Sequence, residues 1–302
     1  MRPIIEKKFT YLFVVTCAFL FVAACNDAPS KERQSILTGT VSVLVDETFE
    51  PIIEDQAAVF ESSYKASNIR VVAKPEREIV RDLLRDSAKI AVMARTLSAE
   101  EEAFFIEQKK IYPVYTKFAV DGLALIAGRS YPDSVVHFQE IIKKIQGLDA
   151  DLPTLVFDNA QSSTVRFLQN LAKVDSLPSS GVYAVKNNEE VIRYVAEHPK
   201  SVGLIGINWI YQPDDDMKDM VSQVKVLKLG DSEQGYFTPN QTSLALGNYP
   251  LARDLYLINC QGGTGLGMGF ASFLAGERGQ RIILKSGLLP DSIPSREVII
   301  RN

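Results

Sequence analysis

Short apolar runs typical of strands alternate with segments of helical spacing along most of the chain. Three such runs alternate with segments whose apolar residues recur every three or four positions. The elements expected here are strands at 39–45, 69–73 and 90–93, and helices at 47–64, 77–86 and from Ser98 onward. Ser98 and Glu101 have the spacing of a capping box, which supports the start of the third helix. This order is typical of an α/β layer with a largely parallel sheet.

A second unit of the same kind begins near residue 118, where a nearly all-apolar run predicts a strand buried on both faces. The elements expected after it are helices at 137–145, from 162 and at 189–197, and strands at 154–157 and 201–207. Near the end, a turn precedes a strand at 249–258 and a final helix stops at Gly287. The stretch GGTGLGMG at 262–269 matches neither G-x-G-x-x-G nor a P-loop and is interpreted as a flexible surface turn.

The first residues are interpreted as a targeting segment. Arg2, Lys7 and Lys8 precede an uncharged stretch at 11–24, which is short for a membrane span but fits the apolar part of a signal peptide. Small residues directly before Cys25 match the lipobox of bacterial lipoproteins, in which this cysteine carries lipid. The alternative is a buried N-terminal helix.

From the lipobox we predict a lipoprotein signal peptide over 1–25 and a polar tether over 26–37. The mature protein is then a lipoprotein anchored to the membrane of the cell envelope, facing the periplasm or the extracellular side.

Charge and composition exclude several classes of function. The formal net charge of −4 becomes −6 once residues 1–24 are removed, because they hold three basic residues and one acidic residue. An acidic chain without a basic stripe is a poor candidate for nucleic-acid binding. His137 and His198 are the only histidines, and no known catalytic or metal-binding motif includes them. We therefore expect no catalytic residue, cofactor or metal site, and interpret the acidic triplet at 214–216 as a solvated turn and Cys260 as a small buried residue.

Hydroxyl side chains follow two predicted strands at the points where a helix begins. Thr48 and Phe49 follow the first strand, and Ser162, Ser163 and Thr164 follow the strand at 154–157. Helix N-termini offer unpaired N–H groups and the positive end of the helix dipole, so hydroxyls there suit an anion. The alternative is that Thr48 and Ser162 only cap helices. Two such junctions, one in each predicted lobe, favour a shared anion site.

Charged residues near the same sheet edge complete the predicted site. Arg95 is able to grip an oxyanion with two parallel hydrogen bonds, with a surface salt bridge as the alternative. Asp46, Asp121 and Asp158 suit a ligand that still carries a proton, as phosphate does at neutral pH. A carboxylate there accepts the hydrogen bond of that proton and repels fully ionised sulfate.

Over roughly residues 38–302 these segments resemble the periplasmic phosphate-binding protein family, the PstS-like substrate-binding component of phosphate ABC transporters. The run 48–51 (TFEP) is similar to the family's Thr-Phe pair followed closely by Pro, and 162–164 (SST) to its Arg-x-x-x-Ser-Gly-Thr loop. The segments 249–256 and 270–280 resemble its Tyr-Pro-Leu-x-Arg-x-Leu-Tyr and Phe-x-x-Phe-Leu…Gly-Gln motifs. The family arginine four residues before the serine is Asp158 here, and Arg95 is a possible replacement from the other lobe.

The resemblance implies a two-lobed, type II periplasmic-binding-protein fold, or venus flytrap. Lobe 1 is expected from 38–118 plus 234–302, and lobe 2 from 119–233. The implied function is capture of inorganic phosphate or a related oxyanion for an ABC permease, without enzymatic activity. The alternative is a structural or signalling lipoprotein of the same fold that binds a protein or cell-wall partner. The predicted ligand-binding residues are Thr48, Phe49, Arg95, Asp121, Asp158, Ser162, Ser163 and Thr164.

Overall fold

The computed structural model describes residues 35–231 and 235–292. The predicted signal peptide, the lipobox Cys25 and most of the predicted tether lie outside these residues. In the described ranges, none of the helices combines the length and the apolar character needed to cross a membrane.

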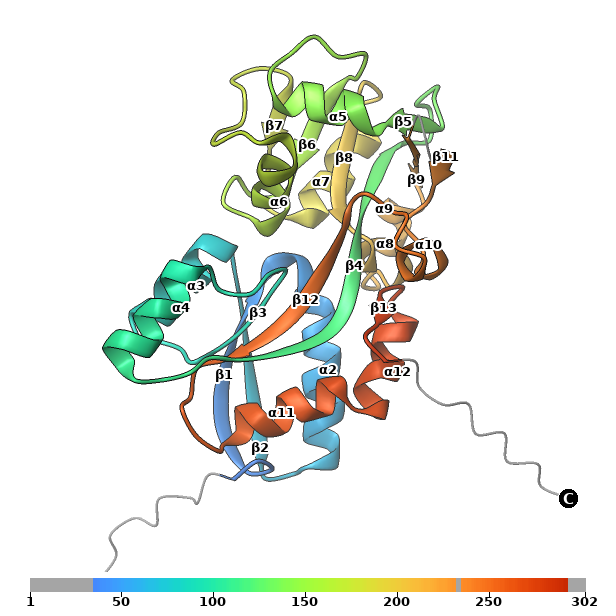
Figure 1. Cartoon of the computed structure of the whole chain (residues 1–302). Coiled ribbons are helices and arrows are strands. Elements are labelled where there is room, and N and C mark those ends of the chain that lie inside the picture. The colour runs from blue at the N-terminus through green and yellow to red at the C-terminus, as the bar shows by residue number, and fades with distance from the viewer. Residues whose placement is uncertain (1–34, 232–234, 293–302) are drawn as a thin grey trace, which may run out of the picture. The chain divides into compact units, whose positions relative to one another are not determined.

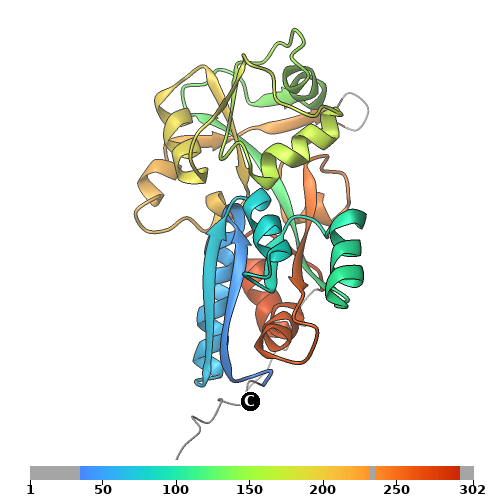
Figure 2. The ribbon, with the colours of Figure 1, turned by 90° about the vertical axis from the view of Figure 1, so that its left-hand side faces the viewer.

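The first lobe is a parallel sheet with helical crossovers, as the alternation of apolar runs predicts. β1 pairs in parallel with β2 on one side and with β3 on the other. Figure 2 shows β1 and β2, the two blue strands, side by side with α2 packed along them. The elements are β1 (Gly39–Asp46), η1 (Glu47–Phe49), α2 (Glu50–Ser63), β2 (Ser67–Lys74), α3 (Glu76–Leu84), β3 (Ile90–Met93), α4 (Ala99–Phe104) and η2 (Phe105–Lys109).

One long strand, β4 (Val114–Gly128), joins the two lobes. Its first part pairs antiparallel with β12 (Ala252–Asn259), and its last part pairs antiparallel with β8 (Ser201–Gly206). Figure 1 shows β4 and β12 running side by side from the first lobe into the second. The chain passes from one lobe to the other along β4, and the predicted boundary at 118/119 falls inside this strand. The other predicted boundary, at 233/234, lies outside the described residues, and β11 (Gly235–Phe237), expected in lobe 1, pairs with β10 (Lys228–Asp231) of the second lobe.

The second lobe repeats the pattern of the first. In the main sheet the strand order is β2-β1-β3-β12-β4-β8-β6-β7. β12 therefore lies beside β3 of the first lobe, and β4 lies beside β8 of the second. The elements are β5 (Val135–His137), α5 (Phe138–Ile145), β6 (Thr154–Phe157), α6 (Ser163–Ala172), β7 (Val182–Ala184), α7 (Asn188–Glu197), α8 (Asn208–Tyr211), α9 (Lys218–Val221), β9 (Val224–Val226), β10 (Lys228–Asp231), β11 (Gly235–Phe237) and α10 (Gln241–Ala245). The small sheet β11-β10-β5 had no counterpart in the sequence prediction.

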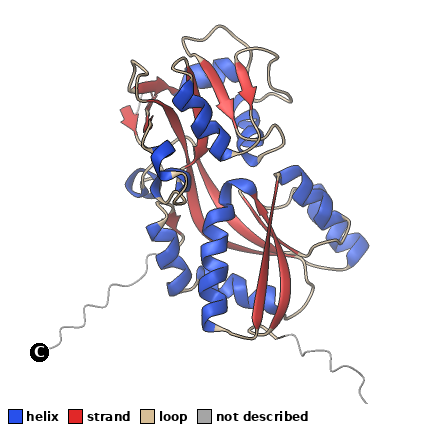
Figure 3. Cartoon of the chain, turned by 180° about the vertical axis from the view of Figure 1, so that it is seen from behind, coloured by secondary structure: helices blue, strands red, loops and turns tan. Residues whose placement is uncertain are grey.

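Helices cover both faces of the sheet, as Figure 3 shows. Phe49, Phe60 and Phe270 are fully buried in an apolar cluster that extends from the first lobe into the second, and Leu155, Phe157 and Leu168 are fully buried in another cluster. The predicted two-lobed α/β fold is confirmed by this arrangement. Cys260 is buried, and both histidines are exposed.

The glycine-rich stretch at 262–269 is only partly a turn, so the prediction for it was wrong. α11 (Leu266–Ala275) begins inside it, followed by α12 (Glu277–Lys285) and the short β13 (Leu289–Pro290). A Cβ at Gly269 would lie 1.7 Å from the carbonyl oxygen of Ile36, and one at Gly267 would lie 2.4 Å from Ile90. These glycines therefore serve close packing of a buried helix.

Candidate functional site

The two predicted junctions meet at one buried carboxylate. The Ser162 hydroxyl donates to Asp158 Oδ1 over 2.6 Å, and the Thr48 hydroxyl donates to Asp158 Oδ2 over 3.4 Å. Thr48 follows β1 of the first lobe, whereas Asp158 and Ser162 follow β6 of the second. All three side chains are buried. Hydroxyl groups from both lobes are thus hydrogen-bonded to one carboxylate.

Local capping fixes the positions of these side chains. Asp46 Oδ1 accepts a hydrogen bond from the Thr48 N–H over 3.0 Å, and Ser162 Oγ accepts one from the Val165 N–H over 3.2 Å at the start of α6. A hydroxyl oxygen accepts and donates at the same time, so Ser162 caps α6 and still donates to Asp158. Capping and participation in the site are therefore compatible at Ser162.

Residues after β8 hold the backbone of Thr48. Its carbonyl oxygen accepts hydrogen bonds from Trp209 Nε1 over 2.9 Å and from Asn208 Nδ2 over 3.2 Å. Both donors belong to α8, so the start of the first helix of one lobe is fastened to the other lobe.

An arginine that the sequence analysis did not place in the site lies at its centre. Arg253 Nε donates to Asp121 Oδ2 over 2.9 Å, and Arg253 Nη1 donates to Ser163 Oγ over 3.0 Å. Asp121 and Arg253 are directly opposite each other on β4 and β12. The guanidinium carbon lies 4.9 Å from the centre of the Phe49 ring, within the range of a cation–π contact. Three of the predicted site residues, Phe49, Asp121 and Ser163, thus contact one buried cation.

Three buried polar atoms of this cluster have no protein hydrogen-bond partner. They are Arg253 Nη2, Asp46 Oδ2 and Thr164 Oγ1, and these residues are 4%, 1% and 0% exposed. Buried polar groups are nearly always hydrogen-bonded, because an unpaired one costs about 1–3 kcal/mol. Two donors and one acceptor, carried by β12, α6 and the end of β1, therefore have unused hydrogen-bonding capacity. In the described parts of the chain, no group of three or more His, Cys, Asp or Glu is placed to hold a metal ion.

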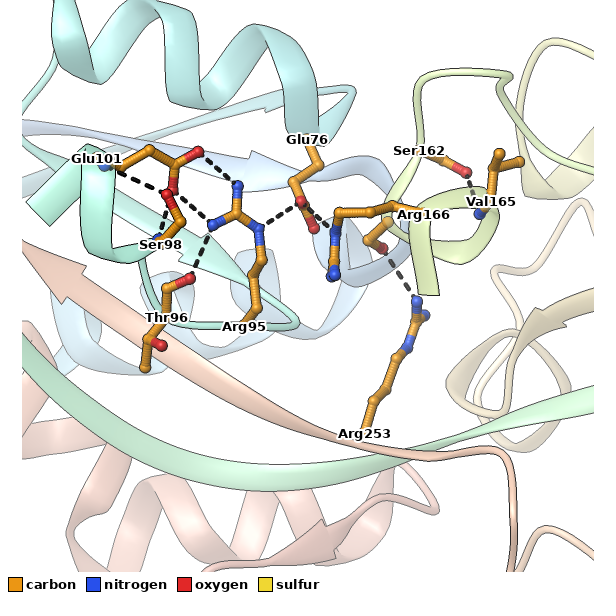
Figure 4. A network of polar contacts seen from close by, with 10 residues as sticks. Glu76, Arg95, Thr96, Ser98, Glu101, Ser162, Val165, Arg166 and Arg253 are labelled. Atoms are coloured by element: carbon orange, nitrogen blue, oxygen red, sulfur yellow. Dashed lines mark hydrogen bonds and ion pairs between the residues drawn. The ribbon is translucent and has the colours of Figure 1, made fainter. Parts of the chain in front are cut away.

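Arg95 belongs to a separate network of ion pairs, shown in Figure 4. Its Nε donates to Glu76 Oε1 over 2.8 Å, and its Nη1 and Nη2 donate to Glu101 over 2.6 and 3.0 Å. The salt-bridge alternative therefore describes Arg95 better than the ligand-binding prediction, because carboxylates already occupy its guanidinium. Arg166 of α6 forms an ion pair with the same Glu76 oxygen at 2.5 Å. Glu76, which is buried, thereby bridges α3 of the first lobe and α6 of the second.

Burial dominates the electrostatics of the cluster. Desolvation raises the pKa of Asp158 to about 6, although the hydrogen bond from Ser162 opposes this rise. Desolvation, together with the charge of Glu76, raises the pKa of Asp46. Burial and the nearby Asp158 raise the pKa of Glu47 to about 7. Carboxylates outnumber the single arginine, so protonation of one of them makes the cluster better suited to an anion.

Gly206, the last residue of β8, allows the two lobes to approach closely here. A Cβ at this position would lie 2.7 Å from Thr48 Cγ2 and 2.7 Å from Asn208 Oδ1. We expect Gly206→Ala to lower the free energy of unfolding by about 1–3 kcal/mol, because the added methyl group overpacks the contact. Urea unfolding measures this change. Gly263→Ala is the control, since a Cβ there meets nothing within 4 Å, and equal stability of both variants contradicts the close approach.

Comparisons with known proteins match the same arrangement of elements. The sequence model of the PBP superfamily domain matches residues 30–278. No curated protein matches the chain significantly.

Solved structures align over most of the chain. The structure of a phosphate ABC transporter substrate-binding protein from Clostridium perfringens, with phosphate bound, has a TM-score of 0.69 at 18% identity and covers 84% of this chain and 100% of that chain. An ABC-type phosphate transport receptor from Vibrio cholerae has a TM-score of 0.62 at 17% identity, and the alignment covers 83% of this chain and 100% of that chain. The CcmR regulatory domain of Synechocystis in complex with 2-PG has a TM-score of 0.53 at 14% identity, and the alignment covers 78% of this chain and 96% of that chain. At these identities the likeness establishes the fold.

Proposed function

The chain belongs to the PBP superfamily, and on that premise we propose that it is a substrate-binding protein that captures phosphate or a related oxyanion for an ABC transporter. Solved phosphate-binding members of ABC systems share its fold from end to end of their own chains. The proposed ligand residues are Thr48, Phe49, Asp121, Asp158, Ser162, Ser163 and Thr164, together with Asp46 from the sequence analysis, and to these we add Arg253.

The buried guanidinium of Arg253 carries this proposal. One of its terminal nitrogens is engaged by Ser163, while the other has no protein partner. Buried arginine is the side chain best suited to a tetrahedral oxyanion, because its N–H groups form charge-assisted, paired hydrogen bonds. The hydroxyl of Thr164, in the first turn of the ten-residue helix α6 and next in sequence to Ser163, is a second unpaired donor.

The lipobox supports a further part of the proposal. Attachment of lipid at Cys25 would hold the binding protein at the membrane surface, with the residues before 38 as a tether. A short tether raises the effective concentration of the binding protein at a membrane permease. The proposed cycle is capture of the anion, closure of the two lobes and docking on that permease.

Isothermal titration calorimetry of residues 26–302 with phosphate, sulfate, molybdate and acetate tests the ligand. We expect saturable heat with phosphate at one site per chain, and none with acetate, which is planar and carries two oxygens. The Arg193→Met variant serves as a control, because Arg193 is exposed on α7. Absence of heat with all three tetrahedral oxyanions contradicts the proposed function.

One observation favours a second candidate, a lipoprotein that keeps this fold and recognises a protein or cell-wall partner instead. Asp158 stands where the resembling family has an arginine, and it already satisfies the hydroxyls of Thr48 and Ser162. The fold also occurs in regulatory domains, such as CcmR. A chain that binds no oxyanion in the calorimetric test fits this second candidate.

A further inference from the structure

The Asp158 carboxylate lies between two hydroxyls that belong to opposite lobes. Its Oδ1 accepts from Ser162 over 2.6 Å and its Oδ2 from Thr48 over 3.4 Å. It is fully buried, so water does not compete for these two hydrogen bonds. The position of Asp158, at the end of β6 and four residues before the cap of α6, places it where the strand edge meets the helix N-terminus.

A bound oxyanion needs the same two donors. Each hydroxyl group has one proton to donate, so Thr48 and Ser162 are able to donate either to the Asp158 carboxylate or to a ligand oxygen, but not to both. An ionised carboxylate is itself an oxyanion with two acceptor oxygens. Ionised Asp158 and a bound tetrahedral anion therefore compete for the same donors.

The charges around Asp158 sharpen this competition. Asp46 at the end of β1 and Glu47 in η1 are the carboxylates that face it, and Arg253 on β12 is the cation that faces it. Arg253 is already paired with Asp121. A second anion next to an ionised Asp158 is therefore repelled by more negative charge than the arginine offsets.

We propose that the Asp158 carboxylate competes with the ligand for the hydroxyl groups of Thr48 and Ser162. When Asp158 is ionised, it accepts hydrogen bonds from both hydroxyls across the two lobes. When it is protonated, it releases them and donates its own proton to the bound oxyanion. This inference rests on the proposed function, because it concerns the same site. It assigns to Asp158 a specificity-determining role in which anion binding requires uptake of one proton by the protein. Proton uptake neutralises the side chain, and no other bond is made or broken.

The expected size of the effect follows from the fraction of chains that are competent to bind. With a pKa of about 6, Asp158 is protonated in roughly one chain in 30 at pH 7.5, and the apparent affinity falls by the same factor. At pH 5 almost all chains are competent. Removing the carboxylate thus raises affinity at pH 7.5 and has little effect at pH 5.

The test is titration of wild type, Asp158→Asn and Asp158→Ala with inorganic phosphate at pH 5, 6 and 7.5. The ratio of wild-type to variant dissociation constants is compared at each pH, because the ionisation of phosphate itself cancels in that ratio. Glu47→Gln is the matched control, since it removes a nearby carboxylate that makes no hydrogen bond to Thr48 or Ser162. We expect both Asp158 variants to bind roughly 30-fold more tightly than wild type at pH 7.5 and within about threefold at pH 5.

Different outcomes separate this inference from the proposed function. Tighter binding by the Asp158 variants that fades as the pH falls supports it, as does binding by these variants at pH 7.5 when wild type binds only at pH 5. A ratio near one at every pH overturns it while leaving the proposed function intact. A gain in affinity of the Asp158 variants that is independent of pH also overturns it. So does a gain of equal size in Glu47→Gln, because the removal of one negative charge then explains the tighter binding without competition for the two hydroxyls. No binding by any protein at any pH refutes the proposed function, and the inference with it.

Discussion

Replacing Arg253 with methionine is expected to lower the free energy of unfolding by about 3–5 kcal/mol and to abolish anion binding. Asp121 is fully buried, and its Oδ2 would lose the guanidinium 2.9 Å away. A buried charge without its partner is strongly destabilising, because neither water nor another cation replaces the lost interaction. Because methionine keeps most of the side-chain volume, the decrease in the free energy of unfolding reflects the lost charge and hydrogen bonds. Urea unfolding and calorimetry measure the two effects.

A double variant separates stability from binding. Arg253→Met combined with Asp121→Asn removes both charges, so much of the lost stability should return while anion binding stays absent. Arg193→Met controls for the substitution itself at an exposed helix position. Wild-type stability in the single variant would show that the buried ion pair is not formed, and retained phosphate binding would remove Arg253 from the site.

The second large effect concerns the dependence of stability on pH. The folded-state pKa of Asp158 is raised to about 6, above the unfolded value of about 3.9. A raised pKa means that the folded state binds the proton more tightly, so the resulting stability is fully present below about pH 4 and is lost as the pH rises through about 6. We therefore expect Asp158→Asn to be more stable than wild type by up to about 3 kcal/mol at pH 8, and by almost nothing at pH 4.

Urea unfolding of both proteins at pH 4, 6 and 8 measures this difference. Asp215→Asn is the control, because Asp215 is exposed in the loop before α9 and its charge pairs with Lys218. A stability difference that is constant with pH, or that grows toward low pH, would contradict the raised pKa of Asp158. The comparison needs no ligand, so it is independent of the proposed function.

Local patterns made most of the fold predictable. The strands expected at 90–93 and 154–157 coincide with β3 and β6, and the capping box at Ser98 forms as expected. These features depend on residues near one another in the sequence, where periodicity and capping act. The small sheet β11-β10-β5 was missed because its strands (VVH, KLGD and GYF) include polar or glycine residues and lack the nearly unbroken apolar run of the equally short β3 and β6.

The site was predictable where it consists of helix junctions and not where it depends on strand pairing. Arg253 lies 132 residues from Asp121, and only the pairing of β12 with β4 brings them together. An arginine within the otherwise largely apolar run 251–258 was the available signal. The salt-bridge alternative for Arg95 holds because Glu101, whose spacing from Ser98 indicates only a capping role, also pairs with this arginine.

The position of Arg253 on a crossing strand has a mechanical consequence. β4 and β12 are the paired strands along which the chain passes between the lobes, and Arg253 and Asp121 face each other across that pair. If one lobe rocks against the other about these strands, the guanidinium lies close to the axis of that motion and is expected to move little. An anion would therefore meet the guanidinium of Arg253 at the same place in the open and in the closed form. Thr48 and Ser162, which belong to the two lobes, would then determine how long the anion remains bound.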